Sequence, residues 1–220
     1  CIRDRNGSLF HTDAVQAVGH ISINVHNLGV DMLSASAHKF NGPKGVGFLY
    51  IRNGIEILPY SDGGAQESGL RAGTENIAGI VGMAVALKNN CDALEENVKH
   101  VRGLESKLVD MLDNTGIQYT RNGGADRLPG LVSLSFPGIE GEAILHRLDL
   151  NGICVSTGSA CNSKSTEVSH VLQAIRLEDS YAKGTIRISL GKANTEDEVE
   201  AIFNACLLYT SPSPRDSTSS

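Results

Sequence analysis

The pattern of hydrophobic and polar positions predicts a chain in which strands and helices alternate. Short apolar runs bounded by Gly, Pro or polar residues are typical of strands, and apolar residues at three- and four-residue spacing are typical of helices. The expected strands are near residues 31–37, 46–51, 130–136, 153–156 and 185–190. The expected helices are near residues 75–89, 92–113, 140–150, 167–175 and 195–206. This alternation predicts an α/β fold built from packed layers.

The segment 185–190 alternates aliphatic residues with polar ones. If it forms a strand, Ile186, Ile188 and Leu190 lie on one face, because successive side chains of a strand point to opposite faces. The aliphatic face is then buried, and Arg187 is presented on the other face.

Two of the expected helices carry further signals. The helix at 92–113 has apolar residues at helical spacing, which predicts one face buried in a core. These residues are Leu94, Val98, Val101, Leu108 and Met111. The last helix opens with Thr195 and Glu198, whose spacing predicts a capping box.

The same pattern suggests two domains and a tail. The Asn89-Asn90 pair is the expected boundary, which divides the chain into residues 1–89 and residues 90–206. Residues 207–220 are rich in Ser, Thr and Pro and have no apolar period. We therefore expect this last stretch to be a disordered or non-native tail.

Composition narrows the function classes. A net charge of -6 predicts no general affinity for nucleic acid or anionic membranes. No apolar run approaches the ~20 residues of a membrane span. The five cysteines are odd in number and widely spaced, which argues against a disulfide framework and predicts a reducing compartment such as the cytoplasm. Cys154, Cys161 and His170 could be proposed as metal ligands, but they contain no close C-x-x-C pair, and we predict no metal site.

One lysine stands where a small-residue strand meets a turn. The run Ser34-Ala35-Ser36-Ala37-His38-Lys39 is soon followed by Gly42-Pro43-Lys44-Gly45. Small side chains leave room beside the strand for a flat ligand, and Ser36 and His38 can donate hydrogen bonds to a phosphate. The amine of a lysine held in such a place can attack a carbonyl group. These residue types suit a pyridoxal phosphate site, and an exposed lysine at a strand-to-turn junction is the alternative.

Asp13 and Gln16 lie upstream, three positions apart in the run from Phe10 to Gln16. If the chain turns helical after a strand, this spacing puts a carboxylate and an amide on one side of the turn. Pyridoxal phosphate needs a carboxylate against its pyridine nitrogen, because the protonated ring draws electrons from the substrate. We therefore expect both side chains to face one ligand.

Together these motifs resemble the cysteine desulfurases of the NifS/IscS type, within the class V aminotransferase-like pyridoxal phosphate enzymes. The resemblance implies the α/β fold of the type I pyridoxal phosphate transferases, shared with aspartate aminotransferase, with the C-terminal part of the large domain followed by the small domain. It also implies that Lys39 carries the cofactor and that Asp13 pairs with its pyridine nitrogen. Gln16 would reach the ring hydroxyl, and Ser36 with His38 would bind the phosphate.

A second motif surrounds Cys161, which follows Gly158-Ser159-Ala160. No bulky neighbour covers this thiol in the sequence, so an accessible loop is expected, although free cysteines are often small buried residues. The run resembles the desulfurase loop whose cysteine takes sulfur from the substrate as a persulfide. By contrast, Cys154 lies between Ile153 and Val155, where we expect it to pack as an inert apolar group.

Two further motifs gain a role through the resemblance. It implies that Arg187 holds the carboxylate of the substrate, a task suited to a bidentate guanidinium, whereas the residues alone would also fit a solvated arginine. It implies that Thr74 reaches the cofactor phosphate of a neighbouring subunit, which predicts a homodimer. The role of Arg71, in the same motif as Thr74, stays open.

The sequence departs from the family pattern in places. Ala65 stands where members commonly have glycine, and Ser68 stands where they commonly have arginine. The chain starts at Cys1, shortly before the Asp13 motif, whereas family members have a long stretch ahead of it. That stretch supplies a phosphate-binding turn, a histidine that stacks on the cofactor ring and an asparagine near the ring hydroxyl. We therefore expect this sequence to be the C-terminal part of a desulfurase.

The expected reaction converts L-cysteine to L-alanine and leaves the sulfur on Cys161 as a persulfide. The sulfur would then pass to an acceptor protein, such as an iron-sulfur cluster scaffold or a tRNA-thiolation protein. Two alternatives remain at this point. One is a selenocysteine lyase or another class V aminotransferase, and the other is an inactive truncated fragment.

Overall fold

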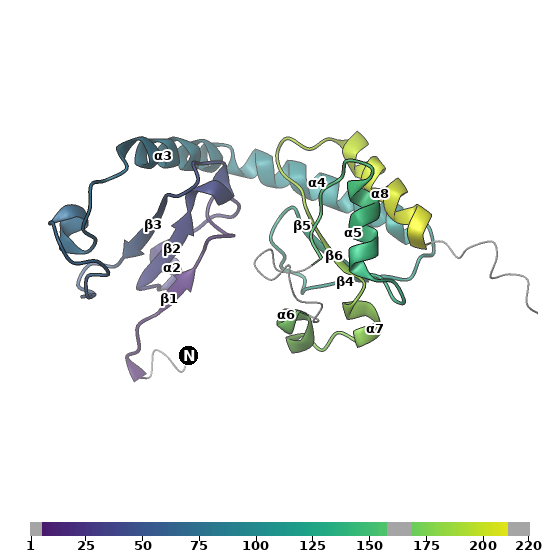
Figure 1. Cartoon of the computed structure of the whole chain (residues 1–220), viewed down its shortest axis with the longest axis horizontal. Helices are drawn as coiled ribbons and strands as arrows, with labels where there is room; N and C mark the ends of the chain where they lie inside the picture. The colour runs from purple at the N-terminus through teal and green to yellow at the C-terminus, as the bar shows by residue number, and fades with distance from the viewer. Residues whose placement is uncertain (1–5, 158–168, 211–220) are drawn as a thin grey trace, which may run out of the picture. The chain divides into compact units, whose positions relative to one another are not determined.

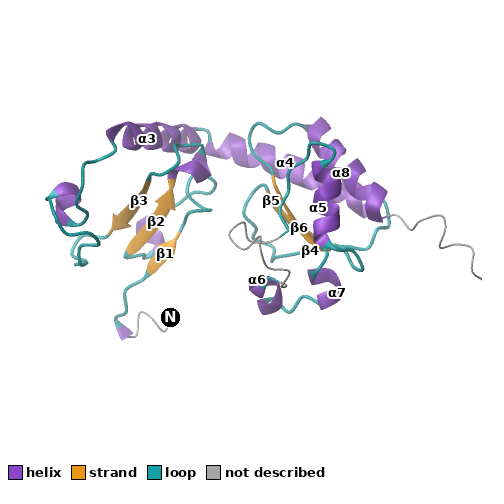
Figure 2. Ribbon diagram, viewed as in Figure 1, coloured by secondary structure: helices purple, strands orange, loops and turns teal. Residues whose placement is uncertain are grey.

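The structure is a computed structural model that describes residues 6–157 and 169–210. Its contacts divide the chain into two units, Cys1–Glu96 and Asn97–Ser220, and each unit has a sheet and a hydrophobic core. Strands and helices alternate along both units (Figure 2). The α/β layering predicted from the sequence is therefore confirmed.

The sheet of the first unit has the strand order β1-β2-β3. Its strands are β1 (His11–Asp13), β2 (Met32–Ser36) and β3 (Gly47–Ile51). β1 pairs with β2 in parallel, and β3 pairs with β2 in the antiparallel direction. The shorter elements of this unit are α2 (Val25–Leu28) and the 3-10 turns η1 (Ala37–Phe40) and η2 (Gln66–Gly69).

Within the described residues, one face of this sheet is packed and the other is partly exposed. Leu33 and Ala35 of β2 are buried, and α3 (Ile77–Asp92) packs against their cluster (Figure 1). Ser34 lies between them on the opposite face, paired with Leu49 of β3, whose side chain is 47% exposed. The alternation of small and apolar residues along β2 thus assigns one face to the core and leaves a polar face beside it.

The second unit is built from a sheet and several helices (Figure 1). Its strands pair antiparallel in the order β4-β5-β6. The strands are β4 (Thr120–Arg121), β5 (Leu131–Ser135) and β6 (Thr185–Ser189). The helices are α4 (Leu94–Asp113), α5 (Gly141–Asp149), α6 (His170–Ala174), α7 (Asp179–Ala182) and α8 (Glu196–Thr210).

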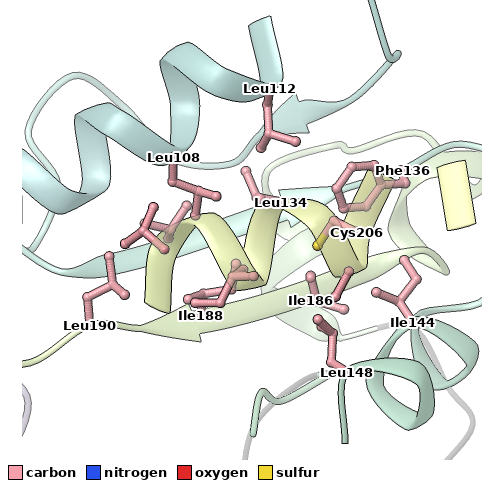
Figure 3. Packing of buried hydrophobic residues seen from close by; sticks show 14 of the residues in the cluster. Leu108, Leu112, Leu134, Phe136, Ile144, Leu148, Ile186, Ile188, Leu190 and Cys206 are labelled. Atoms are coloured by element: carbon pink, nitrogen blue, oxygen red, sulfur yellow. The ribbon is translucent and has the colours of Figure 1, made fainter. Parts of the chain in front are cut away.

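Figure 3 shows the core of the second unit, where the sheet and three helices meet. The cluster joins fully buried side chains from α4, β5, α5, β6 and α8. These include Leu108, Leu134, Leu148, Ile186 and Cys206. In β6, Ile186 and Ile188 are buried while Arg187 is half-buried on the opposite face, so the predicted alternation is confirmed.

The core face of α4 differs from the predicted stripe. Val101 and Leu108 are buried as expected, but Leu104 and Leu112 complete the buried face while Met111 is only half-buried. Over a long helix the period of 3.6 residues moves the buried face by one position toward Leu112.

The expected strand at 153–156 is wrong, because only an isolated bridge between Ser156 and Arg187 forms there. Cys154 is exposed, which corrects the expectation of a packed thiol. Its neighbours Ile153 and Val155 are the residues that pack against the core, and an extended backbone turns the side chain between them outward.

Element ends also differ from expectation. The boundary expected at 89–90 lies inside α3, and the contacts divide the chain between Glu96 and Asn97 instead. α8 continues through Thr210, beyond the expected start of the tail at residue 207. Among the helices that the structure describes, none is long and apolar enough to cross a membrane.

The first testable feature is the cap of α8, where the predicted capping box is confirmed. The Glu198 N–H donates to Thr195 Oγ1 over 3.3 Å, and the Thr195 N–H donates to Glu198 Oε2 over 2.9 Å. We expect Thr195→Ala to lower the free energy of unfolding by about 1 kcal/mol. Thr195→Ser, which keeps the hydroxyl, should lose much less in urea unfolding, and equal losses would contradict the capping role.

The second prediction concerns thiol reactivity. Cys206 is 1% exposed, and burial raises the pKa of its thiol to about 12. At pH 8 only about one thiol in ten thousand would then be ionised, and the thiolate is the reactive form. Iodoacetamide should therefore label the exposed Cys91 and Cys154 in the native protein and label Cys206 only after denaturation. Native labelling of Cys206 at a similar rate, measured by mass spectrometry, would contradict this.

Candidate active site

The carboxyl ends of β1 and β2 lie at the same edge of the first sheet. Asp13, the last residue of β1, is in parallel register with Ser34 of β2. The Ala14 N–H donates to the Ser34 carbonyl oxygen over 2.9 Å, which carries the pairing one residue further. In open α/β sheets this edge is where ligands bind.

Asp13 lies on the partly exposed face of the sheet. Side chains that are in register on parallel strands share a face, so Asp13 lies on the face of Ser34 and Ser36. His11 Nε2 is 3.2 Å from Ser34 Oγ, which agrees with this assignment. The carboxylate is oriented locally, because Asp13 Oδ1 accepts the N–H of Val15 over 3.0 Å.

A tight turn follows Asp13 and exposes Gln16. The N–H groups of Ala17 and Val18 both donate to the carbonyl oxygen of Ala14, over 2.9 and 3.0 Å. Ala14 and Val18 are buried, while Asp13 and Gln16 are exposed. The turn expected from the sequence is therefore present, and it leaves the carboxylate and the amide accessible to a ligand.

Lys39 lies in the turn that follows β2. Ser36 is the last residue of the strand, and its Oγ is 2.8 Å from Nδ1 of His38. Lys39 is half-buried, and among the residues that the structure describes its amine has no hydrogen-bond or ion-pair partner. The turn ends at Asn41 in the left-handed conformation, with φ of 65°.

The loop after this turn comes close to β2. A Cβ added at Gly47 would lie 2.4 Å from the carbonyl oxygen of Ala35, so only glycine fits at this first position of β3. A Cβ at Gly42 would lie 2.9 Å from the Cβ of Ala37. These glycines let the Gly42-Pro43-Lys44-Gly45 loop fold back beside the lysine turn.

Thr74 lies in a long loop of the same unit and is exposed. The loop is held by a bridge between Ser61 and Arg71. Arg71 Nη1 donates to the carbonyl oxygens of Ala72 and Gly73, over 3.2 and 2.9 Å. Arg71 therefore stabilises the backbone next to Thr74, which supplies a structural role for a residue that the sequence left open.

Arg187 belongs to the second unit, where its backbone is paired on both sides. It lies opposite Ser133 in the sheet, and on its other side it exchanges two backbone hydrogen bonds with Ser156, of 3.1 and 2.6 Å. Arg187 is half-buried, and within residues 6–157 and 169–210 its guanidinium has no ion-pair partner. Thr157, which follows Ser156, donates its hydroxyl to Oε1 of Glu142 over 2.8 Å. Cys161 lies outside the described residues.

Comparison with known proteins identifies the family. The family model described as aminotransferase class-V matches residues 1–202. The chain belongs to the class-V aminotransferase family.

Its relatives within this family are named as desulfurases. The chain is 48% identical over 197 residues to a cysteine desulfurase IscS of Clostridium botulinum, covering 88% of this chain and 50% of that protein. The chain thus spans about half the length of the curated relatives it matches.

Solved structures give the same result for the fold. A NifS-like protein superposes with a TM-score of 0.82 at 43% identity, covering 92% of this chain and 52% of that one. SspA, solved in complex with cysteine, superposes with a TM-score of 0.67 at 32% identity, covering 88% and 53%. The predicted fold, that of the type I pyridoxal phosphate transferases, is confirmed.

This class-V aminotransferase chain brings Asp13, Ser36, His38 and Lys39 to one edge of a sheet. Sequence patterns missed two residues that touch the lysine turn, His20 and Asn90. Asn90 could have been noticed, because it continues the helical stripe of Met83, Ala86 and Leu87, where a polar residue is unexpected. No sequence signal separates His20 from an exposed histidine.

Proposed function

We propose that the protein to which this chain belongs is a pyridoxal phosphate-dependent cysteine desulfurase. The observation that carries the proposal is the shared edge at which Asp13 and the Ser36-His38-Lys39 turn meet. The names of its relatives support this choice over a selenocysteine lyase, which would belong to the same family. The reaction would release L-alanine from L-cysteine and retain the sulfur on the protein.

The residues at the edge suit the cofactor chemically. Asp13 supplies an exposed carboxylate for the pyridine nitrogen, and the exposed Gln16 amide would contact the ring hydroxyl. Ser36 Oγ and His38 Nδ1, already 2.8 Å apart, would share the phosphate, and the amine of Lys39 would hold the cofactor covalently. When bound, pyridoxal phosphate acts as an electron sink for the attached amino acid.

Three side chains would then divide the work on the substrate. Arg187 would bind the carboxylate of L-cysteine through its guanidinium. The amine of Lys39, once displaced by the substrate amine, would take the proton from the α-carbon. The thiolate of Cys161 would attack the substrate sulfur, so that a sulfur–sulfur bond forms and the carbon–sulfur bond breaks. The electron pair of the broken bond stays on the carbon skeleton, which is protonated to alanine.

The assembly and the destination of the sulfur follow from the same proposal. Thr74 would reach the cofactor phosphate of a second subunit, so the working enzyme would be a homodimer. The persulfide on Cys161 would pass its sulfur to an acceptor protein, for example an iron-sulfur cluster scaffold, in the cytoplasm. The odd number and wide spacing of the cysteines agree with a reducing compartment.

The third prediction tests the cofactor lysine. Borohydride reduction of the full-length protein loaded with pyridoxal phosphate should attach the cofactor to Lys39, as read by peptide mass spectrometry. Lys39→Ala should lower turnover of L-cysteine by at least about a hundredfold, because both covalent attachment and proton transfer are lost. Lys44→Ala is the matched control in the neighbouring loop and should retain labelling. Labelling of Lys44 in the parent protein would refute the assignment.

The fourth prediction separates Cys161 from Cys154. Cys154 is exposed, so an accessible thiol alone does not distinguish the two. After incubation of the full-length protein with L-cysteine, mass spectrometry should find the added sulfur on Cys161. Cys161→Ser should keep cofactor binding and lose alanine formation, whereas Cys154→Ser should keep most of it. Sulfur on Cys154, or turnover of L-cysteine by Cys161→Ser at the parent rate, would contradict the assignment of Cys161 and favour the lyase alternative.

A further inference from the structure

Asn90 is a buried polar residue that the proposed reaction does not use. It lies near the end of α3 and is only 5% exposed. Its Nδ2 donates to the carbonyl oxygen of Phe40 over 2.7 Å and to that of Ala86 over 2.8 Å. The first of these hydrogen bonds is buried and ties α3 to the residue after Lys39.

His20 makes a matching contact from another part of the fold. Its Nε2 is 2.8 Å from the carbonyl oxygen of Lys39. Because a carbonyl oxygen can only accept, Nε2 must carry the proton in this hydrogen bond. His20 follows Gly19, where an added Cβ would lie 2.8 Å from the Cβ of Phe40. The backbone at Gly19 therefore packs closely against Phe40, the last residue of the lysine turn.

The two donors hold consecutive carbonyl groups at the end of η1. The last carbonyls of a helical turn have no partner within the turn, and a buried carbonyl left unpaired is costly. Phe40 is fully buried, so its carbonyl depends on Asn90 for a partner. Together the two contacts fix the peptide planes on the carboxyl side of Lys39 and of Phe40.

We propose that His20 and Asn90 are positioning residues for Lys39. By fixing the peptide planes around the lysine they fix the direction of its Cα–Cβ bond, and therefore the place from which its amine reaches the cofactor. This inference rests on the proposed function, since the two hydrogen bonds position a reactive group only if Lys39 is the cofactor lysine. Both side chains would act through the backbone of the turn, whose carbonyl oxygens they contact.

The test compares variants in the full-length protein through two measurements. Asn90→Ala and His20→Leu remove one donor each, and His20→Gln keeps an amide N–H near the position of Nε2. Asn89→Ala and His26→Leu are matched controls, because both side chains are exposed residues of the same types. The N–H groups of Asn41 and Gly42 donate to the Ala37 carbonyl oxygen, so their hydrogen exchange rates measure how well the turn is held. This measurement is made on the protein before cofactor is added. Borohydride trapping at timed intervals after adding pyridoxal phosphate reports on attachment at Lys39.

We expect Asn90→Ala and His20→Leu to exchange these amides about tenfold faster and to trap the cofactor at Lys39 about tenfold more slowly, the size of one lost buried hydrogen bond. His20→Gln should stay within about twofold of the parent, and the two controls should not change. If Asn90→Ala does not fold, as judged by circular dichroism, the pair His20→Leu and His20→Gln decides.

Trapping at Lys39 at the parent rate in Asn90→Ala and His20→Leu would overturn the inference while leaving the proposed function intact, even if the turn exchanges faster. A parent protein that traps the cofactor at another lysine would refute the proposed function and this inference with it. The two failures are therefore distinguishable from one set of samples.

Discussion

The parallel pairing of β1 with β2 is the constraint on which the first unit depends. With Asp13 in register with Ser34, both strands end at the same edge, and the turns that follow them carry Gln16 and Lys39. A slip of one residue would move Asp13 to the face that packs against α3, because side chains of a strand alternate between faces. The register thus decides whether the carboxylate meets a ligand or the core.

The two faces of β2 differ in their surroundings: one packs in the core of the first unit, and the other carries half-buried serines. Leu33 and Ala35 are buried beside Phe40 and α3, so the strand is anchored through one face only. The other face carries the half-buried Ser34 and Ser36, whose hydroxyls lie within hydrogen-bond distance of His11 and His38. Such an arrangement lets a ligand site occupy the sheet without removing apolar surface from the core.

The sequence predicted those parts of the fold and site that local patterns determine. Alternation identified β2, β5 and β6, and the Ser36-His38-Lys39 motif identified the lysine turn, because neighbouring residues specify both. Local patterns failed where distant contacts decide. The Asn89-Asn90 pair was expected to be the domain boundary, but Asn90 lies inside α3 and donates a buried hydrogen bond to the carbonyl oxygen of Phe40. β1 has only three residues, too few for a period to be recognised.

The lysine turn therefore has two sources of order that differ in kind. Its shape comes from its own sequence, through the left-handed Asn41 and the carbonyl of Ala37, which accepts two N–H groups. Its placement comes from His20 and Asn90, which are remote from Lys39 in the sequence. If the motif were transferred to another chain, it would keep its shape. It would not keep its placement, because the donors His20 and Asn90 belong to the surrounding fold. Placement is the property that a reactive amine requires, since a lysine side chain is long and its amine is guided only by the backbone from which it starts.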